Sequence, residues 1–160
     1  MPEPRFIYWD ANVFLSYLNN DPDRFPTLDA ILEAVESSNK KERIVTSVIS
    51  KVEVLWVAHE KLNRALSREE ESRIDAMWNN PDVIEMVDFN DEIAVVARKA
   101  MREGMVRGWK LRTNDAIHLA SAQWVAASEL HTYDMKHFEK FSELLGLVIC
   151  EPHAIQPKLF

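Results

Sequence analysis

Short apolar segments alternate along the chain with longer segments in which apolar residues recur every three or four positions. Short apolar runs between polar residues are typical of buried strands, and the three-to-four spacing is typical of amphipathic helices. We predict strands over residues 6–9, 43–46, 83–87, 129–132 and 147–150. We predict helices over residues 12–18, 26–38, 68–78, about 90–103, 115–126 and 135–141, with a further helix from about residue 48 that carries Val48, Val52, Leu55 and Leu62 on one face.

This alternation of strands and helices determines the expected fold class. Successive strands separated by helices require crossover connections, which favour a parallel sheet covered on both faces. We therefore expect an α/β protein, a three-layer α/β/α sandwich with a mainly parallel central sheet. A chain of 160 residues suits one hydrophobic core, so a single domain over residues 1–160 is expected. Gly104 and Gly108 are expected to bracket a loop after the 90–103 helix.

The bulk composition indicates a soluble protein of a reducing compartment. No apolar run approaches the roughly 18 residues that a membrane span needs, and no basic and apolar leader precedes the first strand. The single cysteine, Cys150, cannot form an internal disulfide, and it is interpreted as a small buried hydrophobic residue. We expect a cytoplasmic protein without a membrane partner.

The net charge of −7 argues superficially against nucleic acid as a partner. The sum is a blunt measure, because clustered carboxylates lower it while a bound divalent ion reverses their local sign. One basic concentration stands out, made of Lys99, Arg102, Arg107, Lys110 and Arg112. Phosphate contacts and an ordinary solvated helix end explain it equally well.

Four carboxylates occupy positions that solvent-facing charge does not explain. Asp10 and Asp134 directly follow predicted strands, and Asp115 opens a predicted helix. Glu53 lies on the margin of an apolar helical stripe, shortly after the second strand. In parallel sheets, ligands bind outside the carboxyl ends of the strands. The sequence therefore predicts that these acids meet at one edge of the sheet, around a cation.

Each acid also has a local explanation. Asp10 and Asp134 suit helix N-caps, Asp115 suits the first turn of a helix, and Glu53 forms a formal capping box with Ser50. These explanations are independent and predict no common location, whereas a shared site does. The histidines His118, His131 and His137 are interpreted as structural or surface residues, because they lack partners at zinc-site spacing.

With these residues in place, nearly the whole chain resembles the PIN-domain nucleases, close to the toxin subunits of VapBC toxin–antitoxin systems. Four motifs occur in order: residues 8–14 (YWDANVF), Thr46-Ser47 followed by Glu53, residues 114–122 (NDAIHLASA), and Thr132-Tyr133-Asp134 with His137-Phe138. Two departures are Ala11, where the family more often has a hydroxyl residue, and Trp9, where a smaller aliphatic residue is usual. No acid is lost.

The resemblance implies a PIN-like fold and a metal-dependent endoribonuclease that hydrolyses RNA phosphodiester bonds with Mg²⁺ or Mn²⁺. Asp10 and Asp115 are the expected principal ligands, Asp134 would bind directly or through water, and Glu53 would complete the shell or orient the attacking water. Asn12 and Thr132 are candidates for outer hydrogen bonds to these carboxylates, with local turn or cap bonds as the alternative. Lys110 and Arg112 are candidates for RNA contacts.

The resemblance also implies a toxin component with an antitoxin partner and a homodimeric state. Two other functions stay open. A catalytically inactive PIN-like module that binds RNA or protein would work without metal. A Mg²⁺-dependent phosphatase on another doubly wound fold is disfavoured, because position 12 is asparagine and no glycine-rich phosphate loop is present.

Overall fold

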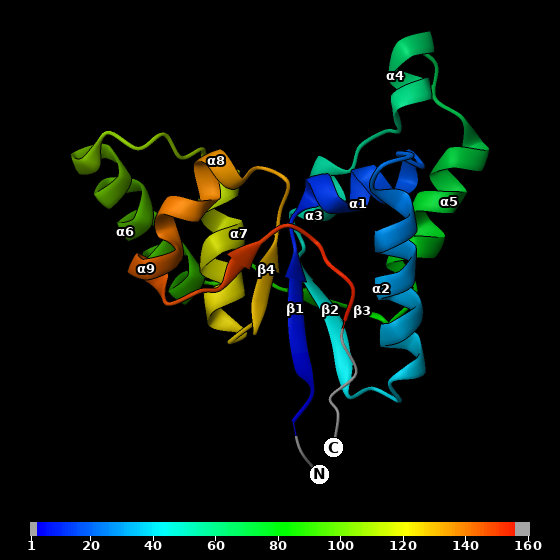
Figure 1. The fold of residues 1–160 in the computed structure, drawn as a ribbon. Coiled ribbons are helices and arrows are strands. Elements are labelled where there is room, and N and C mark those ends of the chain that lie inside the picture. Colours follow the sequence, from blue (N-terminus) through cyan, green and yellow to red (C-terminus); the bar gives the residue numbers. More distant parts are fainter. Residues whose placement is uncertain (1–2, 156–160) are drawn as a thin grey trace.

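Five parallel strands form the central sheet of the computed structural model, which describes residues 3–155. The strand order is β3-β2-β1-β4-β5, and every adjacent pair is parallel. The strands are β1 (Arg5–Trp9), β2 (Glu42–Ser47), β3 (Ile84–Val87), β4 (Glu129–His131) and β5 (Ile149–Cys150). The predicted parallel sheet is confirmed, with β1 at its centre (Figure 1).

Helices cover both faces of the sheet, as the three-layer prediction requires (Figure 1). One layer packs on Ile7, Trp9 and Ile44, and the other on Tyr8, Val45 and Leu130. The first layer contains α1 (Ala11–Leu18), α2 (Phe25–Ser37) and α5 (Arg68–Trp78). The second contains α6 (Asp91–Arg107), α7 (Thr113–Trp124), α8 (Met135–Phe138), η1 (Glu139–Phe141) and α9 (Ser142–Leu145).

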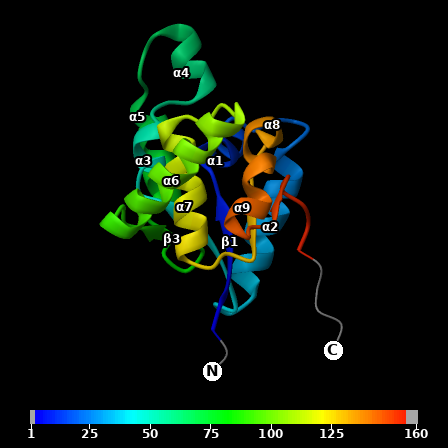
Figure 2. The same ribbon diagram turned by 90° about the vertical axis from the view of Figure 1, so that its left-hand side faces the viewer.

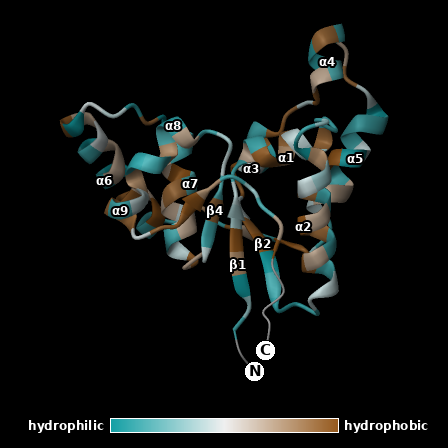
Figure 3. Ribbon diagram, viewed as in Figure 1, coloured by the Kyte–Doolittle hydropathy of each residue, from teal (hydrophilic) through white to brown (hydrophobic). Residues whose placement is uncertain are grey.

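Alternation along β1 explains how one strand serves both layers. Successive strand residues point to opposite faces, so Ile7 and Trp9 enter one core while Tyr8 enters the other. The apolar residues of the sheet and of the inner helix faces appear brown in Figure 3. The three β1 residues are at most 1% exposed, which makes the carboxyl end of β1 a rigid platform.

The helix predicted from residue 48 is wrong in its extent. The structure has a single turn, α3 (Ser50–Glu53), then an irregular segment and α4 (Ala58–Asn63). Val52, Leu55 and Leu62 are 75%, 60% and 83% exposed, so their helical spacing does not mark a buried face. The α3–α4 segment projects beyond the carboxyl edge of the sheet, most clearly in Figure 2. No helix in residues 3–155 is long and apolar enough to cross a membrane.

The predicted loop start at Gly104 is also wrong, because Gly104 lies inside α6. A Cβ at this position would lie 3.1 Å from the Phe141 ring and 3.2 Å from the Trp109 carbonyl oxygen. The glycine therefore permits close packing of α6 against η1 and its own following segment. The helix ends at Gly108, whose φ of +72° is favourable only for glycine.

Candidate active site

Asp10 is fixed at the carboxyl end of β1 by two hydrogen bonds. Thr132 Oγ1 donates to its Oδ2 at 2.6 Å, and the Val13 amide donates to its Oδ1 at 3.2 Å. The second bond makes Asp10 the N-cap of α1, so the capping explanation holds alongside any other role. Asp10 is 2% exposed, and this burial raises its pKa above the ordinary value, an effect that the Thr132 bond and nearby His118 oppose.

Asp115 is a buried acid in the first turn of α7, as the sequence indicated. Its Oδ2 accepts a hydrogen bond from Nε of Arg112 at 3.1 Å, and the two side chains form an ion pair. Asp115 is also close enough to Asp10 to raise the pKa of that carboxyl further. Asp10 and Asp115 therefore come from different elements and are near enough for their negative charges to repel one another.

The third acid, Glu53, is held by a buried histidine of α7. His118 Nε2 lies 2.6 Å from Glu53 Oε1, and His118 Nδ1 lies 2.6 Å from the Tyr8 hydroxyl. The Ser47 amide donates to that hydroxyl at 3.0 Å, so Tyr8 is free to donate its own proton to Nδ1. Neutral His118 then carries its proton on Nε2 and donates to Glu53. The capping-box explanation for Glu53 fails, because its carboxylate is held by α7 rather than by its own helix.

His118 is thus a site residue that the sequence interpretation missed. It is 1% exposed, so it is not a surface residue, and it contacts one of the predicted acids. A signal was available, since His118 stands three residues after Asp115 and such residues share a helix face. Tyr8 gave no such signal, because a tyrosine in an apolar strand looks like ordinary core.

One pocket of about 320 Å³ collects these groups, with Asp10, Glu53, Asp115 and His118 in its lining. Asn12, predicted as a supporting residue, lines the same pocket, and Arg112 stands at it with its side chain 77% exposed. The pKa of Arg112 is raised, first by its hydrogen bond to Asp115 and by that carboxylate's charge, then by Asp134 and Glu53. Lys110 lines a different, more apolar pocket.

Asp134 is the predicted acid that stands apart. It does not line this pocket, and its Oδ1 lies 2.8 Å from His137 Nδ1 instead. Its side chain does not cap α8, but its amide donates to Thr132 Oγ1 at 3.0 Å. Thr132 therefore links the backbone at Asp134 to the carboxylate of Asp10.

The donor set of the pocket fits a hard divalent cation. Its three carboxylates face a single guanidinium, that of Arg112, and oxygen ligands are those that Mg²⁺ and Mn²⁺ prefer. Within residues 3–155, no three of the four acids bring oxygens within 4.8 Å of one another. Mg²⁺ uses only one or two carboxylates directly and keeps several waters, so a site for it does not need all of these oxygens in one coordination shell.

Comparisons with known proteins identify the family and the fold. The family model described as PIN domain matches residues 7–144. The fold is similar to that of VapBC2 from Rickettsia felis bound to a DNA fragment from its promoter, with 18% identity, 91% of this chain and 98% of that chain covered, and a TM-score of 0.68.

Two further structures are similar in fold. DNA-bound VapBC from Salmonella typhimurium has 17% identity, covers 92% of this chain and 98% of its own, and has a TM-score of 0.65. VapC20 from Mycobacterium tuberculosis, a sarcin–ricin loop cleaving toxin, has 16% identity, covers 94% and 99%, and has a TM-score of 0.56. A comparison with curated protein sequences finds no match.

Proposed function

The chain belongs to the PIN domain family, and from that premise we propose that it is a divalent-metal-dependent endoribonuclease, the toxin of a toxin–antitoxin pair. The observation that carries the proposal is the pocket in which Asp10, Glu53 and Asp115 converge from three different elements. A merely structural set of caps would have no reason to converge there. VapC20, described as cleaving an RNA loop, has a similar fold and supports RNA as the substrate.

Asp10 and Asp115 are the proposed principal ligands of Mg²⁺ or Mn²⁺, and Asp134, which lies outside the pocket lining, is proposed to act through water. A bound ion of this class supplies an activated water and neutralises charge on the phosphate. Thr132 and the Val13 amide hold the Asp10 carboxylate in one orientation. Asn12 lines the same pocket, and we propose that it forms an outer hydrogen bond to one of these carboxylates.

Glu53 is the proposed acceptor for the proton of the attacking water. His118 holds one of its oxygens and leaves the other free to face the pocket. Arg112 and Lys110 are the proposed phosphate contacts, and Arg112 is the better placed of the two, because its fork of donors stands exposed beside Asp115.

An antitoxin is the proposed protein partner. The described α3–α4 region leaves several large apolar side chains exposed, and such patches mark interaction sites. They are Val52, Leu55, Trp56, Leu62 and Leu66. The similar VapBC structures are toxin–antitoxin complexes, which supports this partner. We also propose a homodimer, for which the apolar pocket between α6 and the segment before α7 offers a surface.

A matched pair of variants tests the proposed activity. The purified chain is incubated with a structured RNA and with a generic phosphomonoester, each with Mn²⁺ and with chelator. We expect RNA cleavage with Mn²⁺ only, and its loss in Asp115→Asn. Asp91→Asn is the control, because Asp91 is likewise a first-turn acid but stands exposed on α6. Metal-independent RNA binding without cleavage would support the inactive module instead, and phosphomonoester hydrolysis alone would support a phosphatase.

A further inference from the structure

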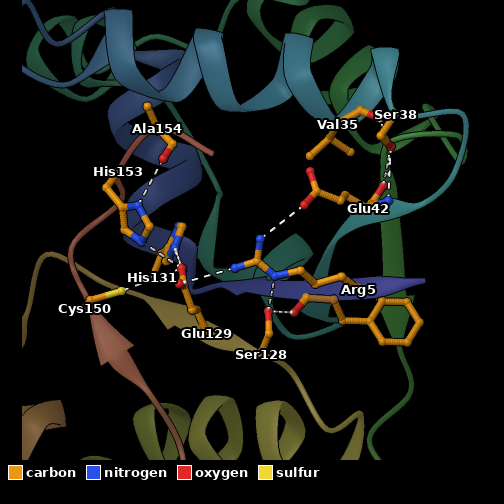
Figure 4. Close-up of polar contacts among 11 residues, drawn as sticks. Arg5, Val35, Ser38, Glu42, Ser128, Glu129, His131, Cys150, His153 and Ala154 are labelled. Carbon is orange, nitrogen blue, oxygen red and sulfur yellow. Dashed lines mark hydrogen bonds and ion pairs between the residues drawn. The ribbon is translucent and has the colours of Figure 1, made fainter. Parts of the chain in front are cut away.

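A second group of metal-ligating side chains lies outside the lining of the proposed active site. Glu129 and His131 belong to β4, Cys150 belongs to β5, and His153 lies in the segment that follows β5. One ligand atom from each residue lies within 4.8 Å of the corresponding atoms of the others. We call these four residues the C-terminal cluster (Figure 4).

Glu129 is the centre of this cluster. Its Oε2 lies 2.8 Å from Nε2 of His131, 2.8 Å from Nε2 of His153 and 3.9 Å from Sγ of Cys150. Its Oε1 accepts a hydrogen bond from Arg5 at 3.3 Å (Figure 4). Burial opposes ionisation of Glu129, but the contacts that the two histidines make with this carboxyl outweigh burial and lower its pKa.

Hydrogen bonds on the far side of each ring assign different roles to the two histidines. The Trp9 indole can only donate, and it lies 3.2 Å from His131 Nδ1. Neutral His131 therefore carries its proton on Nε2 and donates it to Glu129. Burial lowers the pKa of His131, in agreement with a neutral ring at neutral pH. His131 thus orients Glu129 and does not offer a lone pair to an ion.

His153 is arranged in the opposite way. Its Nδ1 lies 3.1 Å from the Ala154 carbonyl oxygen, which can only accept, so Nδ1 carries the proton of the neutral ring. Its Nε2 then directs a lone pair at Glu129 Oε2, only 2.8 Å away. Two acceptors at this distance need a second proton or a metal cation between them.

We propose that Glu129, Cys150 and His153 bind one transition-metal ion of the Zn²⁺ class, with His131 holding Glu129 in position. Oxygen, sulfur and nitrogen donors together suit Zn²⁺, whereas Mg²⁺ and Mn²⁺ prefer oxygen alone. Donor atoms on a tetrahedral Zn²⁺ lie roughly 3.3–3.7 Å apart, between the 2.8 Å and 3.9 Å separations of this cluster. The side chain of His153 is 52% exposed and has room to make that adjustment.

The ion would connect three separate parts of the chain. It would join the first residue of β4, the last residue of β5 and the segment after β5, and so hold residues 151–155 against the sheet. Cys150 is half-buried rather than fully buried, so its sulfur is accessible to an ion. Burial raises the pKa of the Cys150 thiol to about 11, so binding would displace a proton from that sulfur.

Cobalt titration of the full chain tests this site directly. Co²⁺ takes the place of Zn²⁺ and gives a thiolate-to-metal charge-transfer band only when a cysteine sulfur ligates it. The chain has one cysteine, so such a band has a single possible source. We expect the band to saturate at one equivalent of Co²⁺, to be bleached by Zn²⁺ and to persist in Asp115→Asn.

Variants separate ligation from folding. Cys150→Ser removes the band, and His153→Ala, at an exposed position, weakens Co²⁺ binding by at least about tenfold with an unchanged circular dichroism spectrum. The control is His59→Ala, an exposed histidine on α4, which leaves binding unchanged. Absence of the charge-transfer band at saturating Co²⁺, or equal affinity in His153→Ala, would overturn the proposal. Neither result bears on RNA cleavage, which the acid variants test.

Discussion

The group of Asp10, Glu53 and Asp115, which we call the acid pocket, and the C-terminal cluster differ in chemistry although both include residues at or next to β1 and β4. Trp9 and His131 are register partners, and the Trp9 indole donates a hydrogen bond to His131 of the C-terminal cluster. Asp10 and Thr132 directly follow these two residues, and their side chains form a hydrogen bond. Alternation along a strand thus gives one pair of strand ends two different surroundings.

The difference lies in the donors and in how they are held. The acid pocket offers oxygen ligands from three elements, and its acids are oriented by Thr132, His118 and Arg112. The C-terminal cluster mixes oxygen, nitrogen and sulfur, and His153 at its rim is mostly exposed. We therefore expect a hard ion such as Mn²⁺ to bind in the acid pocket and a borderline ion such as Zn²⁺ to bind in the C-terminal cluster. Variants in one group should leave the other unaffected.

The largest effect is expected from the acid pocket. Asp10→Asn should lower Mn²⁺-dependent RNA cleavage by about a hundredfold or more, because a displacement of about 1 Å in the reacting groups can cost that much. Cys150→Ser, a variant in the C-terminal cluster, should cleave RNA at the same rate as the unmodified chain. Cleavage rates at saturating Mn²⁺ make this measurement. Equal loss in both variants would show that the two groups do not act separately.

His118 should have the next largest effect, as a positioning residue for Glu53. His118→Gln should lower kcat by roughly 10- to 100-fold, the usual cost of losing an outer hydrogen bond at a metal site. Tyr8→Phe should have a smaller effect in the same direction, because it frees the His118 tautomer without removing the ring. The separate effects on kcat and KM distinguish positioning from a purely structural role, since a misplaced Glu53 lowers kcat and leaves the KM for RNA unchanged. An unchanged kcat, or a change in KM alone, would contradict the role given to His118.

Stability should respond to pH with opposite signs in the two groups when a chelator is present. The pKa of Asp10 is raised above its ordinary value of 3.8, so its ionisation opposes folding once the pH exceeds that value. Asp10→Asn should therefore raise Tm at pH 7, by about 2–4 °C for each kcal/mol gained in a chain of this size. The gain should disappear as the pH falls toward 3.8.

Glu129→Gln should behave in the reverse manner. The pKa of Glu129 is lowered from 4.5, so its ionised form stabilises the folded state above pH 4.5, and that contribution is lost as the pH falls through the lowered value. The variant should have a lower Tm at pH 7 and approach the unmodified chain in acid. Thermal unfolding followed across this range makes the comparison, and parallel curves for the two variants would contradict the opposite shifts.

The sequence predicts the acid pocket better than the C-terminal cluster for a physical reason. Asp10 directly follows β1 and Asp134 lies three residues after the end of β4, and parallel topology then places them at one edge. The rotation of each side chain does not follow from topology, so Asp134 turns toward His137 and stays outside the pocket lining. The C-terminal cluster depends on how the segment after β5 folds back to place His153, and no spacing along the chain indicates that return.

The α3–α4 region shows a second limit of sequence patterns. Val52, Leu55 and Leu62 keep helical spacing, yet the chain leaves helical geometry at Val54, where ψ is 67°. Val54 and Val57 turn inward instead, at 2% and 3% exposed. Periodicity describes which residues would share a face if the helix continued, and it carries no information about where tertiary packing interrupts it.

Crystals of the chain soaked in Mn²⁺, with anomalous scattering used to locate the ion, test the central claim most directly. The account predicts an anomalous peak in the acid pocket, with oxygens of Asp10 and Asp115 within about 2.0–2.6 Å of it, the range for hard cations. A peak confined to the Glu129, Cys150 and His153 side chains, with none beside Asp10, would contradict it.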